Sequence, residues 1–551
     1  MSRFNTRTSR PAARGPVTTT GTRTTTHERG AAFVRDARSD LFLLAVVNLV
    51  GQDAFYESAG DRDNRFRALV RRLAVEDPAW TAGLLGWLRG AANMRSASVV
   101  GAAEFVKARL DAERRGDLAP EGRVAEAAGG GWNRRVIASV LQRADEPGEL
   151  LGYWMQSYGR RVPKPVKRGV ADAVRRLYSG RALLKHDTAS KGYRFGDVLN
   201  LVHAAPDPDK AWQGEVFRYA LDRRHHPENA RPPAGPLAAH AELMALPVGE
   251  RRAVVTSPGG AERLAAAGVT WEALAGWLQG PMDAAAWEAV IPSMGLMALT
   301  RNLRNFDEAG VSDEAAGLVA ARLSDPQEVR RSRQFPYRFL SAYRAAPSLR
   351  WGHALERALT ASTANVPAVP GRTLVLVDTS ASMTGRVFGR SEIRHVDVGA
   401  LFAVALATRG GAVDLVGYAN GTFRHSLVAG GSVLRQTDEF CARIGEVGHG
   451  TETVAALRAA FDGHDRVVIV SDMQAFAHPG NGWADIPTGM SVSEAVPADV
   501  PLFGINTSGY GPAAIDTSRP HRYEVGGFSD QLFTMVDLLS RGRDAGWPWE
   551  S

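Results

Sequence analysis

The spacing of apolar residues changes once along this chain of 551 residues. Over residues 36–362, apolar positions recur at helical spacing in segments of about 12 to 20 residues, separated by Pro, Gly and Asp. Residues 361–372 form a linker containing Pro and Gly, and beyond it short runs of Val, Ile and Leu alternate with helical segments. The pattern predicts an all-helical part followed by an α/β part, whose parallel sheet is covered by helices on both faces.

The helical part is expected to span residues 37–362. No run of alternating strands interrupts it, and successive helix pairs of about 35 to 45 residues would suit a divergent HEAT-like solenoid, although no strict repeat period is visible. The clearest predicted helices cover residues 64–73, 78–92, 96–110, 133–143, 148–158 and 163–178.

The α/β part is expected to span residues 363–551 and to form a doubly wound, Rossmann-like sheet. Continuous apolar runs predict its strands, and amphipathic segments between them predict its helices. The predicted strands are 373–378, 412–418, 466–472 and 501–506, and the predicted helices are 396–407, 439–447, 453–461 and 529–539.

The first 36 residues contain few large apolar side chains and are therefore predicted to be a disordered, basic tail. Over the first 30 residues the arginines outnumber the single acid, Glu28. A solvated tail is the simpler interpretation, and a basic arm that contacts phosphates is the alternative. The arginines are Arg3, Arg7, Arg10, Arg14, Arg23 and Arg29.

One predicted helix, residues 163–178, has a basic face. Its apolar residues fall on one stripe, which should pack inward and leave the cations on the opposite side exposed to phosphates. The alternative is a basic face that only contacts solvent. The net charge of +7 does not distinguish the two interpretations, because polyanion binding requires the cations to be clustered. The candidate RNA-binding residues are Lys164, Lys167, Arg168 and Arg175 on this helix, with Arg134, Arg135, Lys185, Lys191 and Arg194 nearby.

Five oxygen-bearing side chains predict a cation site in the α/β part. Asp378 ends one strand and is followed by Ser380 and Ser382, while Asp472 ends another strand. Both acids should meet at the carboxyl edge of a parallel sheet, where Thr451 adds a hydroxyl from a third loop. Oxygen ligands with few charges suit Mg²⁺ and leave a position open for a partner.

Two alternatives stay open for this site. Thr453 competes with Thr451 for the third position, and an Asp- and Ser-rich turn would explain the first motif without a metal.

Other classes of protein fit the sequence poorly. No segment approaches the ~18 apolar residues of a membrane span, and no apolar stretch follows the N-terminal arginines as in a secretory signal. A single cysteine, Cys441, excludes a disulfide framework, so the cytoplasm is the expected compartment. The phosphate-binding loop of the common ATPases is absent, and no nucleophile or general base accompanies the cation site, which argues against an enzyme.

Two resemblances follow from these motifs. The five oxygen donors resemble the metal-ion-dependent adhesion site of von Willebrand factor A domains. The helical part followed by such a domain resembles the TROVE family, whose best-known member, the Ro autoantigen, binds Y RNAs. The matching segments are residues 86–106, 195–206, 270–278, 287–306 and 332–342.

The TROVE resemblance implies a ring of HEAT-like helical repeats closed by the A domain. It implies that Y-like structured noncoding RNA binds the outer basic surface and that single-stranded ends of misfolded RNA enter the central hole. In bacteria it implies RNA quality control, with an exoribonuclease or RNA-repair proteins as partners. A ring made within one chain favours a monomer.

Two competing hypotheses remain from the sequence. In the first, the chain is a protein-binding helical scaffold with a metal-dependent adhesion module. In the second, it is a metal-dependent nuclease or phosphatase, which fits less well because the sequence offers no catalytic partner for the metal.

Overall fold

Contacts within the computed structural model divide the chain into two compact units. We call Met1–Leu69, Gln334–Arg344 and Leu355–Ser551 the sheet unit, and Val70–Arg333 with Ala345–Ala354 the helical unit. The N-terminal residues thus cluster with the C-terminal sheet, in contrast to the predicted boundary near residue 362. The structure describes residues 13–47, 54, 56–118, 131–188, 190–364, 370–387, 393–410, 412–428, 431–475, 489–526 and 531–550.

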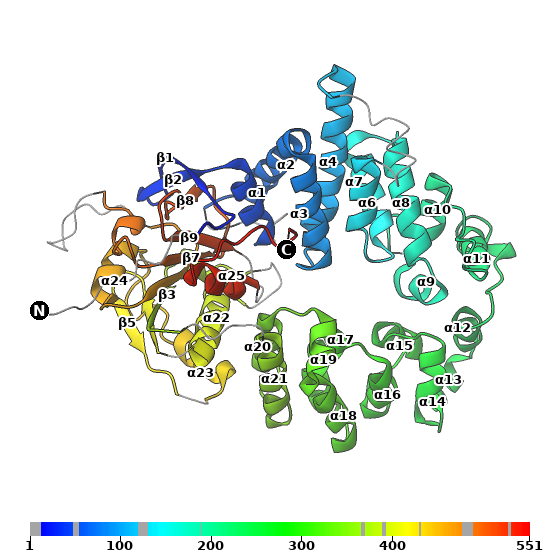
Figure 1. Ribbon diagram of the computed structural model, residues 1–551. Coiled ribbons are helices and arrows are strands. Elements are labelled where there is room, and N and C mark those ends of the chain that lie inside the picture. The colour runs from blue at the N-terminus through cyan, green and yellow to red at the C-terminus, as the bar shows by residue number, and fades with distance from the viewer. Residues whose placement is uncertain are drawn as a thin grey trace, which may run out of the picture. The chain divides into compact units, whose positions relative to one another are not determined.

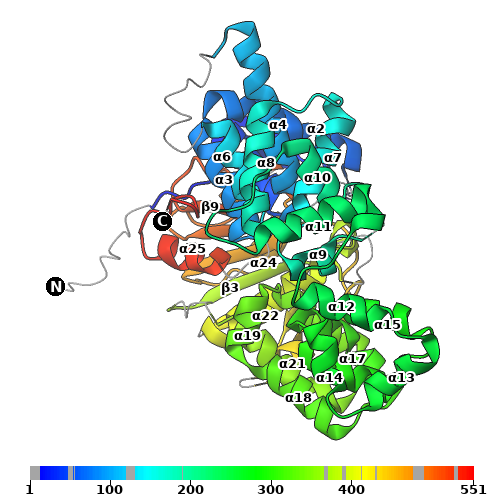
Figure 2. The same cartoon turned by 90° about the vertical axis from the view of Figure 1, so that its right-hand side faces the viewer.

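Helices make up nearly all regular structure of the helical unit, as the apolar periodicity predicts. Neighbours in sequence pack on one another: α6 contacts α3, α4 and α8, and α10 contacts α8 and α11 (Figures 1 and 2). The helices are α3 (Pro78–Gly90), α4 (Arg95–Arg115), α6 (Trp132–Val140), α7 (Glu146–Tyr158), α8 (Lys164–Leu177), α9 (Gly180–His186), α10 (Phe195–Val202), α11 (Gln213–His225), η1 (Pro227–Asn229), α12 (Pro236–Met244), α13 (Val248–Thr256), α14 (Gly260–Ala266), α15 (Trp271–Leu278), α16 (Ala284–Val290), η2 (Ile291–Ser293), α17 (Leu296–Ala309), α18 (Asp313–Ser324) and α19 (Pro326–Ser332).

Local sequence sets many of these helix ends. The side chains of Ser179, Thr270, Asp283 and Ser312 each accept a hydrogen bond from the backbone N–H three residues later, which satisfies a free donor of the first turn. Helix α4 ends at Gly116, whose left-handed backbone (φ 82°) suits a residue without a Cβ.

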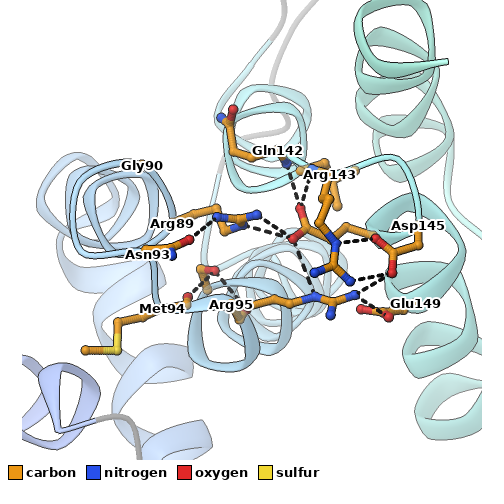
Figure 3. A network of polar contacts seen from close by, with 12 residues as sticks. Arg89, Gly90, Asn93, Met94, Arg95, Gln142, Arg143, Asp145 and Glu149 are labelled. Carbon is orange, nitrogen blue, oxygen red and sulfur yellow. Dashed lines mark hydrogen bonds and ion pairs between the residues drawn. The ribbon is translucent and has the colours of Figure 1, made fainter. Parts of the chain in front are cut away.

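A network of charged side chains joins α3, α4 and α7 (Figure 3). The carboxylate of Glu146 is fully buried and accepts hydrogen bonds from Arg89 Nη2 at 2.6 Å and from the backbone N–H groups of Gln142 and Arg143. Arg95 lies 3.4 Å from the same carboxylate through its Nε. Because every oxygen of Glu146 is engaged, the network holds three helices together at a fixed spacing.

The sheet unit contains a six-stranded sheet in the order β5-β4-β3-β6-β7-β9. All neighbours are parallel except β4 and β5. Its strands are β3 (Thr373–Asp378), β4 (Val413–Tyr418), β5 (Thr422–His425), β6 (Arg466–Ser471), β7 (Leu502–Asn506) and β9 (Arg522–Gly526).

Helices cover both faces of this sheet, as predicted. Helix α24 packs with the face that carries Leu374 and Leu376. Gly399 of α22 lies against Val377 and Val470, which alternate with those residues on the other face. The remaining elements of the sheet unit are α1 (Ala37–Val46), η3 (Ser382–Thr384), α22 (His395–Gly410), α23 (Val433–Cys441), α24 (Thr453–Ala460), η4 (Val492–Glu494), β8 (Pro512–Ala513) and α25 (Gln531–Ser540). Three helices have residues in both units: α2 (Ala59–Glu76), α20 (Pro336–Ala345) and α21 (Leu349–Ser362).

The helix predicted over residues 439–447 is wrong in its bounds, because α23 begins and ends earlier. Ser432 caps its first turn by accepting from the backbone N–H of Arg435. Glu356 of α21 accepts from the backbone N–H of Val433 at 2.8 Å, so a distant carboxylate reinforces this start.

The predicted disordered tail is also wrong for residues 13–36, whereas residues 1–12 lie outside the described part of the chain. Strands β1 (Thr19–Thr25) and β2 (Ala31–Arg35) pair antiparallel, and β2 pairs with β8 to complete a three-stranded sheet. The segment lacks a core of its own and folds by pairing with a strand almost 480 residues later.

A buried ion pair holds this N-terminal sheet to the six-stranded sheet. Both the Arg35 and Glu524 side chains are fully buried, and Arg35 Nε donates to Glu524 at 2.9 Å. Asn506 also donates to this carboxylate. Among the described residues, no helix is both long and apolar enough to cross a membrane.

Arg35→Ala should destabilise the protein by about 3–5 kcal/mol, because it leaves the buried Glu524 carboxylate without its cation. The free energy of unfolding in urea measures the effect. The matched control is Arg435→Ala, which removes an exposed pair with Glu439 and should change stability by at most about 0.5 kcal/mol. Equal effects of the two substitutions would contradict the structural role of the N-terminal segment.

Candidate functional site

The two predicted acidic ligands lie at one edge of the six-stranded sheet. Asp378 is the last residue of β3, and Asp472 directly follows β6. The two strands are parallel neighbours with Val377 opposite Val470, so their carboxyl ends emerge side by side. Both carboxylates are completely buried.

Hydrogen bonds fix Asp378 and its two serines. One oxygen of Asp378 accepts from the backbone N–H of Ser380 at 2.8 Å, and the other accepts from the Ser471 hydroxyl at 2.6 Å. The hydroxyls of Ser380 and Ser382 lie 3.2 Å apart, and both residues are buried. The predicted motif therefore gathers its oxygen atoms in one place.

Two polar atoms at this edge lack partners. Asp472 Oδ1 accepts from the backbone N–H of Gln474 at 3.1 Å, but its Oδ2 has no hydrogen-bond partner, and neither has the buried hydroxyl of Thr451. Thr453, the competing candidate, places its hydroxyl 3.3 Å from the Tyr418 hydroxyl. This geometry favours Thr451 as the third-loop ligand.

The electrostatics also suit a cation. Burial raises the pKa of Asp378 to about 6, in spite of its hydrogen bonds from Ser380 and Ser471. Burial and the negative charge of Asp378 raise the pKa of Asp472 to about 7. Two adjacent buried carboxylates cost free energy that a divalent ion would offset. The residues present fit Mg²⁺.

The site is poor in acids. Within the described ranges, no three His, Cys, Asp or Glu side chains are grouped so that they could hold a metal. Serine and threonine hydroxyls would therefore have to complete the ligand set, as the sequence motif predicts.

The loop that carries Thr451 is held in place by backbone contacts. The backbone N–H of Ala381 donates to the carbonyl of His449 at 3.0 Å, which ties this loop to the one after β3. The side-chain oxygen of Asn420 accepts from the backbone N–H groups of His449 and Gly450. Three loops are thus mutually fixed around the five predicted ligands.

Sequence reasoning missed a further group beside this edge. His27 donates its backbone N–H to the side chain of Gln474 at 2.9 Å, and Tyr56 donates its hydroxyl to Glu28 at 2.6 Å. The Tyr56 hydroxyl also interacts with Ser382. No local pattern signals this placement, because it depends on the pairing of the N-terminal strands with β8.

The basic helix has the face that its sequence predicts. Val166, Val170 and Val174 are buried, and the side chains of Lys164 and Lys167 have no carboxylate partner among the described residues. Arg168 is exposed. Arg160 and Arg161, just before α8, are exposed and were not singled out from the sequence, although their position at the start of this helix was a usable signal.

Four predicted RNA-binding cations are instead engaged within the protein. Arg134 pairs with Asp172 at 2.6 Å, Lys191 with Asp145 at 3.1 Å and Arg194 with the buried Asp187 at 3.0 Å. Arg175 donates to the carbonyl of Ala205 at 2.9 Å. Their charge or donor capacity is engaged within the protein, so these four are not free cations, and their role as RNA contacts stays a prediction.

The two other candidates remain available. Arg135 is exposed, and its guanidinium lies over the ring of Trp132 at 4.5 Å. Lys185 on α9 is exposed and lines a pocket of about 680 Å³.

The pocket beside Lys185 combines cations with apolar surface. Arg181 and Arg301 also line it and are exposed, and none of the three cations has a carboxylate partner in the described part of the chain. Trp271 and the exposed Met297 supply apolar walls. The pocket therefore offers both a flat aromatic ring and positive charge.

Comparison with known proteins supports the predicted resemblance. The TROVE domain model matches residues 266–352. The fold is similar to that in the crystal structure of the Ro (Rsr) protein of Deinococcus radiodurans, with a TM-score of 0.58 and 18% sequence identity over 92% of this chain and 100% of that chain. At this identity the structural similarity concerns the fold alone. The predicted resemblance to the TROVE family is thus confirmed: the TROVE domain model matches part of the chain, and the fold is similar to that of a bacterial Ro protein.

Proposed function

We propose that this chain is a non-catalytic RNA-binding protein that holds structured noncoding RNA on the basic face of α8 and serves as a scaffold in RNA quality control or decay. The observation that carries this proposal is the basic face begun by the exposed Lys164 and the half-buried Lys167, whose charges have no carboxylate partner among the described residues. It lies in a chain of which residues 266–352 match the TROVE domain model. Unpaired cations on a rigid helix bind phosphates without first breaking an internal ion pair.

The finer parts of the proposal come from the family resemblance. They are a ring of HEAT-like repeats closed by an A domain, a Y-like RNA on the outer surface, a cytoplasmic location, a monomeric state, and an exoribonuclease or RNA-repair proteins as partners.

The double substitution Lys164→Glu/Lys167→Glu should weaken binding of a transcribed RNA stem–loop by at least about tenfold. It should also reduce the slope of log affinity against log salt concentration by about 1.5, because two phosphate contacts are lost. Filter binding across a salt series measures both quantities. The charge-matched control is Arg435→Glu/Arg458→Glu in the sheet unit, two exposed positions that should leave affinity unchanged. Equal losses in both variants would refute this face as the binding surface.

We further propose that single-stranded RNA ends, which the resemblance places in a central hole, bind the pocket formed by Lys185, Arg181, Arg301, Trp271 and Met297. An unstacked base can lie on an aromatic or apolar side chain while cations contact the neighbouring phosphates, which is the usual mode of single-strand binding. The unpaired state of the three cations supports this assignment.

Arg181→Glu/Arg301→Glu should weaken binding of a single-stranded oligoadenylate by about tenfold and leave stem–loop binding nearly unchanged. Fluorescence anisotropy with both RNAs measures the two affinities. The Lys164→Glu/Lys167→Glu variant is the reciprocal control, since it should affect the stem–loop more than the oligoadenylate. Loss of both RNAs in both variants would indicate a single continuous surface and overturn the assignment of the pocket.

For the sheet unit we propose a von Willebrand factor A-like domain whose metal-ion-dependent adhesion site holds Mg²⁺. Asp378, Ser380, Ser382, Thr451 and Asp472 would supply its oxygen ligands. Bound there, the ion would offer an open position to a carboxylate of a partner. The unpaired Asp472 Oδ2 and Thr451 hydroxyl support this proposal.

Mg²⁺ should raise the thermal unfolding temperature of the wild-type protein, and Asp378→Ala should abolish this rise. Thr451→Val should weaken Mg²⁺ binding by about tenfold, whereas Thr453→Val should have little effect, because only the Thr451 hydroxyl lacks another partner. Calorimetric titration of metal-free protein measures the affinities. The reverse order of the two threonine variants would identify Thr453 as the ligand.

A further inference from the structure

A second, smaller pocket of the helical unit neighbours the pocket beside Lys185. Arg181 lines both pockets, so they meet at one side chain. The smaller pocket has a volume of about 270 Å³, against about 680 Å³ for the other. We call it the Trp212 pocket, and its apolar walls are formed by Trp212, Val216, Pro233, Pro236 and Leu237.

Trp212 is exposed although its side chain is large and apolar. The exposed fraction of this residue is 47%. The next residue, Gln213, is fully buried, and its side-chain amide donates to the carbonyls of Arg175 and Tyr178 at 2.9 and 3.2 Å. These bonds tie the start of α11 to the end of α8. The backbone that carries the Trp212 ring is therefore fixed before any ligand binds, which lowers the entropic cost of binding.

The backbone of the opposite element, α12, is restrained as well. Pro236 is its first residue, where the fixed φ of proline suits the first turn. Gly235 precedes it with a φ of 93°, a conformation that favours glycine. A Cβ on Gly180 of α9 would lie 3.4 Å from the buried side chain of Leu237, so α9 and α12 approach closely here. The pocket is thus part of the packed fold.

The charges at the Trp212 pocket separate the place of a phosphate from that of a base. Arg181, at the border of the two pockets, is exposed and has no carboxylate partner among the described residues. Glu215 lines the Trp212 pocket but not the pocket beside Lys185, and it pairs with no cation in the described part of the chain. Its carboxylate repels a phosphate, whereas it can accept a hydrogen bond from the exocyclic amino group of a base.

We propose that the Trp212 pocket is a second base-binding subsite for single-stranded RNA. One base stacks on Trp212, and the phosphate that joins it to the nucleotide in the pocket beside Lys185 contacts Arg181. Stacking on an aromatic ring is available to every base, so the subsite accepts strands of different sequence. The inference rests on the single-strand pocket proposed above and deepens it, because it names the path of the strand across α9.

The test measures the affinity of the full-length protein for oligoadenylates in which one abasic nucleotide is moved along the strand, by fluorescence anisotropy. Trp212→Ala should weaken binding of the intact strand by about tenfold, the usual effect of losing one base–aromatic stack. One abasic position should weaken binding to the wild-type protein and have no further effect on Trp212→Ala, because base and ring act as a pair.

Two further variants separate loss of stacking from loss of structure. Trp212→Phe keeps an aromatic ring and should retain most of the affinity and the sensitivity to the abasic position. Leu318→Ala alters a similarly exposed apolar residue on α18 of the same unit and should bind as the wild-type protein does.

The outcomes distinguish this inference from the proposal on which it rests. Undiminished affinity of Trp212→Ala, with binding still weakened by Arg181→Glu/Arg301→Glu, would overturn the second subsite alone. Wild-type binding by both variants would overturn both proposals together. An oligoproline peptide that binds the wild-type protein but not Trp212→Ala, while RNA affinity is unchanged in this variant, would assign the Trp212 pocket to a protein partner and overturn the inference.

Discussion

The sheet unit is built around two buried carboxylates at the ends of adjacent parallel strands. Asp378 and Asp472 are completely buried, and their raised pKa values show that the surrounding hydrogen bonds do not offset the loss of solvation. Such an arrangement costs free energy in the absence of a cation, so the two loops that supply the remaining oxygens, those of Ser380 and Ser382 and of Thr451, need firm support. The contacts of Asn420 with the Thr451 loop provide part of it.

The local pattern of apolar residues was sufficient to predict the strands that carry these acids. The strand 373–378 has the predicted bounds, and 466–471 differs by one residue, because continuous β-branched runs identify strands buried on both faces. The bounds of α23 were mispredicted because its start is reinforced by Glu356 from another segment. The N-terminal hairpin was missed because its partners lie far along the chain: β2 pairs with β8, and Arg35 pairs with Glu524 of β9. The hydropathy of the first 36 residues does not indicate either contact.

Which cations are free to bind RNA is harder to predict from the sequence than the positions of helices and strands. Counting cations near α8 gave nine candidates, but Arg134, Lys191 and Arg194 are neutralised by acids between 7 and 46 residues away. Helical spacing of three or four residues identifies pairs within one helix and gives no information about pairs between helices. Lys164 is exposed and Lys167 is half-buried on the polar side of α8, because their own helix contains the apolar stripe that sets its orientation.

Uncompensated charge is the property that the candidate sites share. In the helical unit, acids from neighbouring helices pair with many of the arginines, whereas Lys164, Lys167 and the three cations of the pocket beside Lys185 have no carboxylate partner among the described residues. In the sheet unit, the two acids of the candidate metal site, Asp378 and Asp472, are completely buried. An exposed cation without a partner costs little free energy, because water solvates it, and it can bind an anion reversibly in a salt-dependent way. A buried carboxylate costs more free energy without a partner, and a bound cation would offset that cost. The ligands proposed for the two units therefore differ in class: polyanions for the helical unit and a divalent cation for the sheet unit.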